Sequence, residues 1–134
     1  MGKRRIYLDN FVHTHHSYYT MPYIAINTVQ ELDSNQKEKI KAELGRIMSI
    51  IPTKTEAGLI IDFSGGHTLY KGGLEIYGAF IDLRLFRKSE LEFKEKYCVE
   101  VFELLSRELG IKKEHMYLTI GEYENWGSNG KLLH

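Results

Sequence analysis

The sequence predicts an α+β fold of two layers, in which two helices cover one face of a four-stranded sheet. A strand, a helix and a second strand follow one another twice, and a glycine-rich link separates the two units. Two such β-α-β units can share one sheet with both helices on the same side, because their crossovers have the same hand. A chain of 134 residues is long enough for one such domain with its own core.

The first unit begins with a strand over 21–29, where apolar residues alternate and Pro22 stands at the first position. Asp33 and Gln36 form a capping box at the start of a helix. The apolar stripe of this helix, and the proline that ends it, are Ile40, Leu44, Ile47, Met48, Ile51 and Pro52. A strand over 59–63 follows, and the helical connection makes the two strands parallel.

The glycine-rich link over 64–73 allows two interpretations. It resembles a phosphate cradle, but the Walker spacing is absent and no helix begins directly after it. A loop or hairpin with a short edge strand is therefore favoured. His67 lies in this link without a visible partner, and we assign it no role.

The second unit starts with a long strand over 76–86, followed by a capping box of Ser89 and Glu92. The helix has its apolar stripe at Leu91, Cys98, Val101, Phe102, Leu105 and Leu109, and Gly110 ends it. Cys98 on this stripe is expected in the core rather than as a nucleophile. A strand over 116–120 completes the unit, and 122–131 has the composition of turns.

The sheet face away from the helices is expected to be apolar and exposed. A monomer rarely leaves a large apolar surface bare, so an oligomer is expected.

Charge and cysteine content exclude several classes of protein. Lysine plus arginine equal aspartate plus glutamate at 18 each, which disfavours a nucleic-acid or membrane surface. No apolar run approaches the length of a spanning helix, and no secretory signal is evident. With Cys98 as the single cysteine, no disulfide framework exists, and we expect a cytoplasmic protein.

Residues 1–20 have no clear period and are interpreted as an extension of a domain over 21–134. They contain His13, His15 and His16, which suggest either a metal site or a tag remnant, a misplaced start or a disordered segment. The second interpretation is favoured, because a metal site needs further ligands on a rigid frame.

Four short stretches, in their order and spacing, resemble a known family. They are Met21-Pro22 before an alternating strand, 51–56 with a lysine after the first helix, the loop 69–73, and 125–130 with the tryptophan. Together they span about 21–130 and resemble the tautomerase superfamily, in particular the branch of macrophage migration inhibitory factor and the bacterial phenylpyruvate tautomerases.

The resemblance implies a homotrimer whose three sheets line a central barrel, with active sites between neighbouring subunits. It implies a small carboxylate-bearing substrate, no metal and no organic cofactor. The family's catalytic N-terminal proline corresponds to Pro22, and its carboxylate-binding lysine to Lys54. The further positions that correspond to substrate-binding residues or pocket walls are Tyr23, Phe86, Tyr117, Thr119 and Trp126.

Three positions depart from the family pattern. Gly58 replaces a usual aromatic residue, so a more open pocket is expected. Arg87 replaces a usual glycine after the third long strand. The CxxC of the animal proteins is missing, so thiol-oxidoreductase activity is not carried over.

The expected chemistry depends on the nitrogen of Pro22. Moving a proton between carbon and oxygen of a 2-oxo acid needs a base that titrates near the working pH. A free α-amine does so at about 7.7–8.0, and an apolar pocket or a nearby cation lowers this value. Pro22 has such an amine only if the chain begins there; otherwise it is an amide without basicity. Lys54 would hold the carboxylate and Tyr117 would donate to the enolate oxygen.

Each of these residues also has a structural interpretation. Pro22 can simply begin a strand, and Lys54 can be a solvated charge at a helix end. Tyr117 can belong to the core, and Trp126 can anchor a turn.

The sequence therefore leaves three candidate functions open. The leading one is a cofactor-free tautomerase of phenylpyruvate-like 2-oxo acids. The second is a non-catalytic trimeric binding or signalling protein in which residues 1–20 block Pro22. The third is a ferredoxin-like small-molecule sensor, which shares the doubled unit.

Overall fold

A computed structural model of the protein describes residues 21–134. The predicted extension over 1–20, with His13, His15 and His16, lies outside the described residues. Both its assignment and the domain boundary at residue 21 stay predictions.

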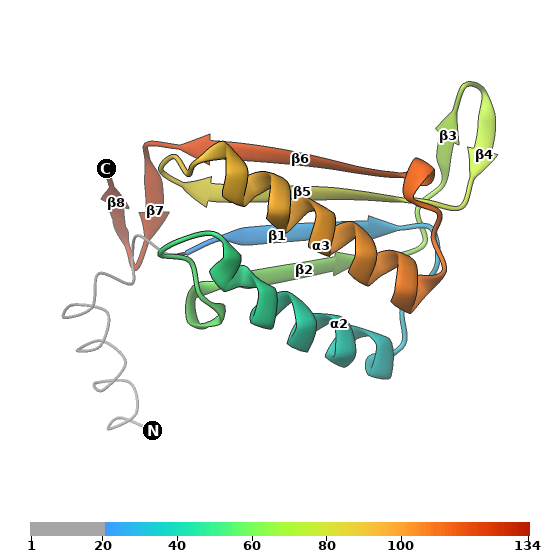
Figure 1. The fold of residues 1–134 in the computed structure, drawn as a ribbon, viewed down its shortest axis with the longest axis horizontal. Coiled ribbons are helices and arrows are strands. Elements are labelled where there is room, and N and C mark those ends of the chain that lie inside the picture. Colours follow the sequence, from blue (N-terminus) through green and yellow to red (C-terminus); the bar gives the residue numbers. More distant parts are fainter. Residues whose placement is uncertain (1–20) are drawn as a thin grey trace.

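The described chain consists of two β-α-β units and two hairpins (Figure 1). The first unit contains β1 (Tyr23–Thr28), α2 (Ser34–Ile47), the short turns η2 (Met48–Ile50) and η3 (Glu56–Gly58), and β2 (Ile60–Ser64). The second contains β5 (Ala79–Phe86), α3 (Leu91–Leu109), η4 (Lys113–His115) and β6 (Met116–Tyr123). The hairpins are β3 (Leu69–Lys71) with β4 (Leu74–Ile76), and β7 (Trp126–Ser128) with β8 (Lys131–Leu133).

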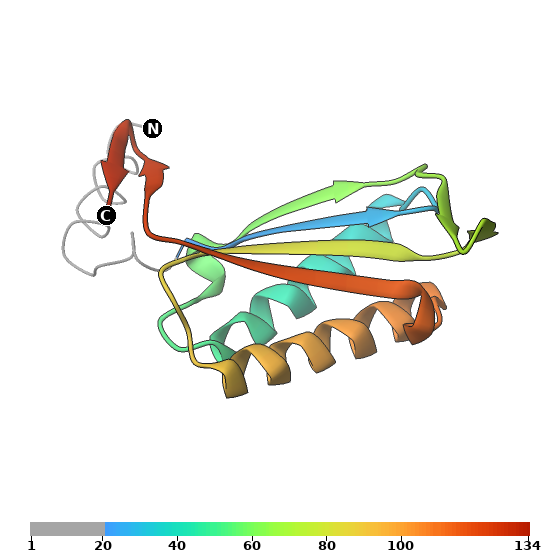
Figure 2. The same cartoon turned by 90° about the horizontal axis from the view of Figure 1, so that it is seen from above.

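The four long strands form one sheet in the order β2-β1-β5-β6. The strands pair in parallel within each unit, and β1 pairs antiparallel with β5 at the junction. Both helices lie on one face, as Figure 2 shows, so the predicted α+β architecture is confirmed. Because β1 and β2 are direct neighbours, the split unit of a ferredoxin-like sensor is excluded.

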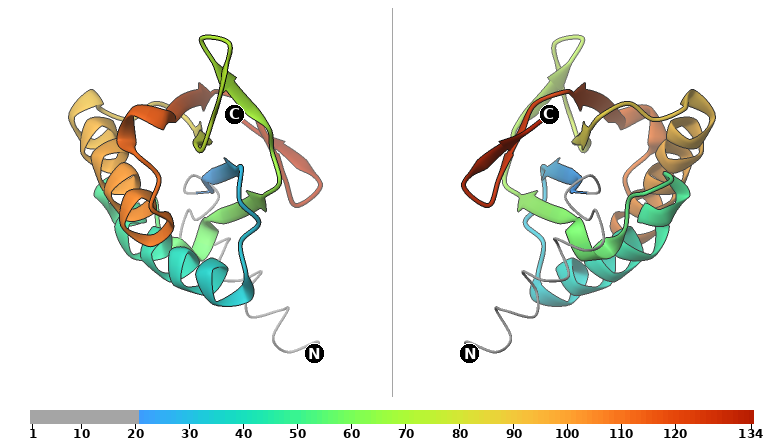
Figure 3. Two further views of the ribbon diagram at one scale, coloured as in Figure 1. Left: turned by 90° about the vertical axis from the view of Figure 1, so that its right-hand side faces the viewer. Right: turned by 90° about the vertical axis from the view of Figure 1, so that its left-hand side faces the viewer.

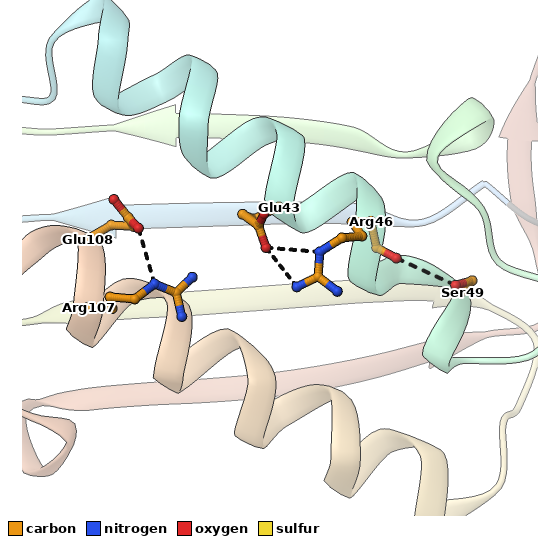
Figure 4. A network of polar contacts seen from close by, with 5 residues as sticks. All are labelled: Glu43, Arg46, Ser49, Arg107 and Glu108. Atoms are coloured by element: carbon orange, nitrogen blue, oxygen red, sulfur yellow. Dashed lines mark hydrogen bonds and ion pairs between the residues drawn. The ribbon is translucent and has the colours of Figure 1, made fainter.

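The core lies between this sheet and the helices, and Figure 3 shows the helices following the curvature of the sheet. Ile24 and Ile26 of β1 are fully buried against it. The predicted stripe of α2 is confirmed, since Ile40, Leu44, Ile47, Met48 and Ile51 are at most 3% exposed. The outer helix surfaces are polar: Arg46 pairs with Glu43, and Arg107 with Glu108 (Figure 4). Lys39 also pairs with Glu108 and thereby links the two helices.

Two of the three helix-end signals predicted from the sequence are confirmed by the structure. Asp33 and Gln36 form the expected capping box of α2. Gly110 ends α3 in the left-handed conformation, with φ of 68°. The capping box of Ser89 and Glu92 is wrong, because the N-cap is Glu90 and makes no side-chain hydrogen bond there. The backbone N–H of Ser89 instead donates to the Glu122 carboxylate of β6 at 2.6 Å.

The predicted strand over 76–86 is divided into two strands. β4 ends at Ile76 and β5 begins at Ala79, with Gly78 between them. A Cβ on Gly78 would collide with the backbone carbonyl of His115, so the chain bends here against η4. The favoured loop with a short edge strand is confirmed as the β3–β4 hairpin, whereas the predicted turns after β6 form a second hairpin.

The apolar stripe of α3 differs from the prediction at its start. Val101, Leu105 and Leu109 are buried as expected, but Leu91 is 65% exposed. Leu91 and the half-buried Cys98 line a groove between α3 and β6, which is the edge strand of the sheet formed by residues 21–134. Burial raises the pKa of the Cys98 thiol and so disfavours a reactive thiolate.

The sheet face away from the helices, here called the open face, is mixed: it carries polar contacts and the exposed side chains of Ile60, Phe80, Tyr117 and Tyr123. Tyr23 donates to Asp62, while Asp82 accepts from both Arg84 and Thr119. The expected exposed apolar face is therefore present in part, and its aliphatic and aromatic side chains keep the argument for an oligomer. The strands alternate in burial, and most of their apolar residues point toward the helices. Within the described part of the chain, no helix has the length and apolarity needed to span a membrane.

Candidate active site

The sheet topology gathers four stretches of the chain at one end. β1 begins there, the parallel strand β2 also begins there, and the antiparallel strand β5 ends there. β7 starts beside them, after β6 has run the same way as β5 (Figure 1). The predicted site residues found at this end are Pro22, Tyr23, Lys54, Phe86 and Trp126.

Pro22 is buried immediately before β1, and its surroundings fix its position. Its carbonyl accepts a hydrogen bond from the backbone N–H of Ile60 at 2.9 Å, which extends the pairing of β1 with β2. Met21 is held too, because the Ser128 hydroxyl of β7 donates to its sulfur at 3.2 Å. In the 134-residue chain the Pro22 nitrogen is an amide bonded to Met21.

Lys54 is a buried cation rather than a solvated charge at a helix end. Its side chain is only 3% exposed, and Nζ donates to the carbonyl of Phe86 at 2.9 Å. Burial lowers the pKa of Lys54, nearby Arg87 lowers it further, and Glu122 opposes the shift. The link after α2 places the lysine here through a turn in which its backbone N–H donates to Ile51.

Aromatic rings surround the last residue of β5. The rings of Phe86 and Trp126 are 6.3 Å apart and tilted by 45°. The ring of Tyr123 also lies 6.3 Å from that of Trp126, tilted by 58°. Such tilted aromatic pairs stabilise the fold by more than the burial of their apolar surface alone. Trp126 therefore anchors β7, and its ring forms a wall at this end of the sheet.

A cavity of about 390 Å³ opens beside these rings on the open face. Its lining consists of Tyr23, Ile60, Arg84, Tyr123, Asn125, Trp126 and Gly127. Tyr23 and Trp126 were expected from the sequence, and the other five were missed. Strand alternation could have identified two of them. Ile60 and Arg84 stand opposite Tyr23 on the neighbouring strands and therefore share its face of the sheet.

Tyr23 and Arg84 form one wall of this cavity, and each is held by an aspartate. The Tyr23 hydroxyl donates to Asp62 at 2.6 Å, and this hydrogen bond raises the pKa of Tyr23. The Arg84 guanidinium lies 5.5 Å from the centre of the Tyr23 ring and pairs with Asp82 at 3.0 Å. The wall thus offers a cation held by both an aromatic ring and a carboxylate.

Tyr117 and Thr119 lie away from this cavity in the same chain. Both face the open side of β6, where Thr119 donates to Asp82 at 2.9 Å. Tyr117 stands four positions before Gly121, the partner of Arg84, which is about 13 Å along the strand. There its ring lies 5.2 Å from the ammonium of Lys71. Tyr117 is 40% exposed, so the alternative interpretation, that it belongs to the core, is wrong.

Among residues 21–134, no cluster of three histidine, cysteine, aspartate or glutamate side chains is arranged to hold a metal ion. This end of the sheet presents the ammonium of Lys54, the guanidinium of Arg84, the hydroxyls of Tyr23 and Tyr123, and aromatic walls.

The fold is shared with solved structures although the sequence has diverged. No protein-family model matches the chain, and no curated protein matches it by sequence. MIF2 of Leishmania major superposes with a TM-score of 0.79 at 18% identity, over 85% of this chain and 98% of that one. The macrophage migration inhibitory factor-like protein of Entamoeba histolytica gives 0.74 at 23% identity, over 84% and 99%.

A member of the cis-3-chloroacrylic acid dehalogenase family, N1, gives a TM-score of 0.71 at 17% identity, over 84% of this chain and 83% of that one. All three belong to the tautomerase superfamily. The resemblance seen in the sequence is thus confirmed at the level of the fold.

Proposed function

We propose that the protein is a cofactor-free keto–enol tautomerase of phenylpyruvate-like 2-oxo acids, with the free amine of Pro22 as its base. The observation that carries this proposal is the position of Pro22: it is buried next to Tyr23, beside an aromatic-walled cavity and at the same end of the sheet as the cation Lys54. The superfamily fold supports the same class of chemistry.

In the proposed reaction the secondary amine of Pro22 takes a proton from the carbon next to the keto group. The electron pair moves to the keto oxygen, which then gains a proton, and the amine returns to its starting state. Such a base works best when its pKa lies near the working pH. Burial in an apolar site disfavours the charged amine and keeps its pKa near neutrality.

Lys54 supplies the charge that holds the substrate carboxylate. An ammonium has three N–H donors, and one of them already points to the carbonyl of Phe86. This bond orients the ammonium at the end of β5. A substrate carboxylate would add charge-assisted hydrogen bonds to it and would favour its protonated form.

A homotrimer completes the proposed site. Tyr117 and Thr119 lie along β6, away from the cavity of their own chain. They reach a substrate only if a neighbouring copy presents its β6 at this cavity, where Tyr117 then donates to the enolate oxygen. One of the similar solved structures is described as an asymmetric trimer of a fused 4-OT.

The proposal is tested with three proteins: the 134-residue chain, a chain that begins at Pro22, and that shorter chain with Pro22→Gly. Intact mass defines each N-terminus, and ultraviolet absorbance follows the enol of phenylpyruvate. We expect activity in the chain that begins at Pro22. The glycine variant should lose about 100-fold in kcat/KM, because it removes the positioned secondary amine. Full activity in a chain verified to retain residues 1–20 would falsify the free-amine mechanism.

The second candidate is a non-catalytic trimeric binding or signalling protein. It applies if the mature protein retains residues 1–20, because the Pro22 nitrogen is then an amide. The mass of the protein isolated from its own cells separates the two candidates. A mass that begins at Pro22 supports catalysis, and one that begins near Met1 supports the binding protein. The cytoplasmic location expected from the sequence is checked by fractionating the same cells.

A further inference from the structure

A second group of polar side chains lies at the end of the sheet opposite Pro22, where the β3–β4 hairpin meets the start of β6 (Figure 1). Gly72 and Gly73 form the two-residue turn of this hairpin, with φ of 60° and 82°. Two residues with positive φ are typical of the hairpin turn whose twist matches that of its strands. Lys71 is the last residue of β3 before this turn, so the hairpin fixes the position of its backbone.

Lys71 and Tyr117 direct their donors at one oxygen atom. Nζ of Lys71 donates to the backbone carbonyl of Glu114 at 3.0 Å, and the Tyr117 hydroxyl donates to the same oxygen at 3.4 Å. The ammonium also lies 5.2 Å from the centre of the Tyr117 ring. Two donors that converge on one oxygen, one of them charged, form the arrangement that stabilises a developing oxyanion.

This pair can turn to an oxygen of a ligand without leaving the Glu114 carbonyl unpaired. Both side chains are exposed, and the hydrogen bond of the Tyr117 hydroxyl is the longer and weaker of the two. When that hydroxyl turns to a ligand, Lys71 still donates to Glu114. An ammonium has three donors on a flexible stem, so Lys71 can hold the carbonyl and a ligand oxygen at once.

Lys71 follows Tyr117 into any contact between copies of the chain. Neither residue lines the first cavity of its own chain, and the proposed function needs Tyr117 of a neighbouring copy at that cavity. Lys71 is bound to the same end of β6, so a contact that delivers the hydroxyl also delivers the ammonium. Its hairpin neighbours Tyr70 and Leu74 are 68% and 73% exposed, which marks this element as an interaction surface.

We propose that Lys71 is a catalytic residue of the neighbouring copy's site, where its ammonium and the Tyr117 hydroxyl together bind the oxygen that becomes the enolate. This inference rests on the proposed function. Removal of the proton from carbon moves an electron pair to that oxygen, and a nearby positive charge stabilises the resulting anion more than the neutral keto group. Lys71 supplies charge and no proton, since the proton that the oxygen gains is the one that Pro22 took from carbon.

The first test concerns placement and needs no turnover. The chain that begins at Pro22, with Cys98→Ser to remove the single cysteine, receives Lys71→Cys and Asn125→Cys, because Asn125 lines the first cavity. A bismaleimide should link these positions between copies, so that denaturing electrophoresis shows dimers and trimers of the chain. The control replaces Lys71→Cys by Lys41→Cys on the outer surface of α2 and should stay monomeric. The absence of a link between positions 71 and 125 would overturn the inference, whatever the activity.

The second test measures binding apart from turnover, in the Pro22→Gly chain. Phenylpyruvate and 3-phenylpropionate share a ring and a carboxylate and differ in the keto oxygen. Trp126 is the single tryptophan and lines the first cavity, so its fluorescence reports binding. We expect phenylpyruvate to bind about fivefold more tightly, because only its keto oxygen accepts from the pair. Lys71→Met should remove this preference, whereas Lys71→Arg and the control Lys41→Met should retain it.

Equal affinities of the unchanged protein for the two ligands would overturn the inference, and so would a preference that survives Lys71→Met. Light scattering verifies that each variant has the mass of the unchanged protein, so that a lost interface is not mistaken for a lost ligand contact. In the active chain, Lys71→Met should lower kcat/KM by about 50-fold, more than the change in affinity, because the charge on the oxygen grows in the transition state.

The outcome stays separable from that of the proposed function. If phenylpyruvate is not converted, but the cross-link forms and the preference for the keto acid depends on Lys71, the shared oxygen site holds and the tautomerase proposal fails. If phenylpyruvate is converted and Lys71→Met changes neither kcat/KM nor the preference, the tautomerase proposal holds and the role of Lys71 is overturned.

Discussion

Tyr97 is fully buried in α3, and its hydroxyl has no hydrogen-bond partner among the described residues. Burial raises the pKa of Tyr97, so the group is a neutral hydroxyl at all ordinary pH values. A buried hydroxyl without a partner costs its lost hydration.

We therefore expect Tyr97→Phe to raise the free energy of unfolding by about 1 kcal/mol. Urea denaturation followed by circular dichroism measures the change. Tyr77→Phe is the matched control, because the Tyr77 hydroxyl donates to the carbonyl of Leu109 at 2.9 Å. The control should lower stability by about 1 kcal/mol. Destabilisation by both substitutions would show that the Tyr97 hydroxyl has a partner.

Lys54 is another buried polar side chain. Its hydrogen bond to the carbonyl of Phe86 places it at the candidate active site. Under the proposed function, Lys54→Ala should raise KM for phenylpyruvate about tenfold and change kcat less, because the carboxylate is bound equally in the ground and transition states. Steady-state kinetics of the chain that begins at Pro22 gives both constants. An unchanged KM would remove Lys54 from carboxylate binding.

At the scale of elements, Glu122 connects the start of α3 with β6. Its carboxylate accepts from the Ser89 N–H at 2.6 Å and pairs with Lys94 at 3.0 Å. Burial raises the pKa of Glu122, but these partners outweigh it and hold the pKa below its ordinary value of 4.5. The resulting stability is present above the unfolded pKa and is lost as the pH falls through the folded pKa.

Glu122→Gln should thus lower the free energy of unfolding by about 1–2 kcal/mol at neutral pH. The difference from the unchanged protein should shrink as the pH falls below 4.5. Urea denaturation over a series of pH values measures it, with the exposed Glu75 of β4 as the control for loss of a carboxylate. A difference that is constant with pH would contradict the assignment.

The bend between β4 and β5 depends on Gly78. A side-chain carbon there would meet the backbone carbonyl of His115, which cannot move without displacing η4. We expect Gly78→Ala to lower the free energy of unfolding by about 1–3 kcal/mol. Gly127→Ala is the control, since its nearest contact would be an ordinary one at 3.9 Å. Thermal unfolding of both variants tests the bend, and equal stability would refute it.

At the scale of the whole molecule, the β3–β4 hairpin stands at the opposite end of the sheet from β7–β8 (Figure 1). It exposes Tyr70 and Leu74 by 68% and 73%. Exposed apolar side chains gathered on a projecting element mark an interaction surface. Together with the exposed apolar side chains of the open face, this hairpin is the surface expected to hold the proposed trimer together.

Leu74→Asp should accordingly convert a trimer into monomers, because the contact between copies would have to bury the new carboxylate without a partner. Light scattering after size exclusion measures the mass. Val99→Asp on α3, where the apolar side chain is 56% exposed, is the control and should leave the mass unchanged. A trimer that persists in Leu74→Asp would exclude the hairpin from the interface.

The sequence by itself determined the two β-α-β units, their order and most of the core. Alternation in 21–29 and the helical spacing from Ile40 to Ile51 are local patterns that report which side of an element is buried. The caps at Asp33 and Gly110 are equally local, because each is a property of a few consecutive residues. The resemblance to the superfamily rested on the order of such local stretches.

Only the tertiary structure decided what meets across the sheet. In the structure, Lys54 donates to the carbonyl of Phe86 and the Ser89 N–H donates to Glu122. Tyr117 lies far from Pro22 along β6. These contacts depend on strand order, register and the ends of the strands, which join residues 32 or more positions apart. The hydrophobic periodicity of the sequence indicates which face of an element a residue occupies. It does not indicate which distant residue shares that face, and the candidate site is formed by such distant residues.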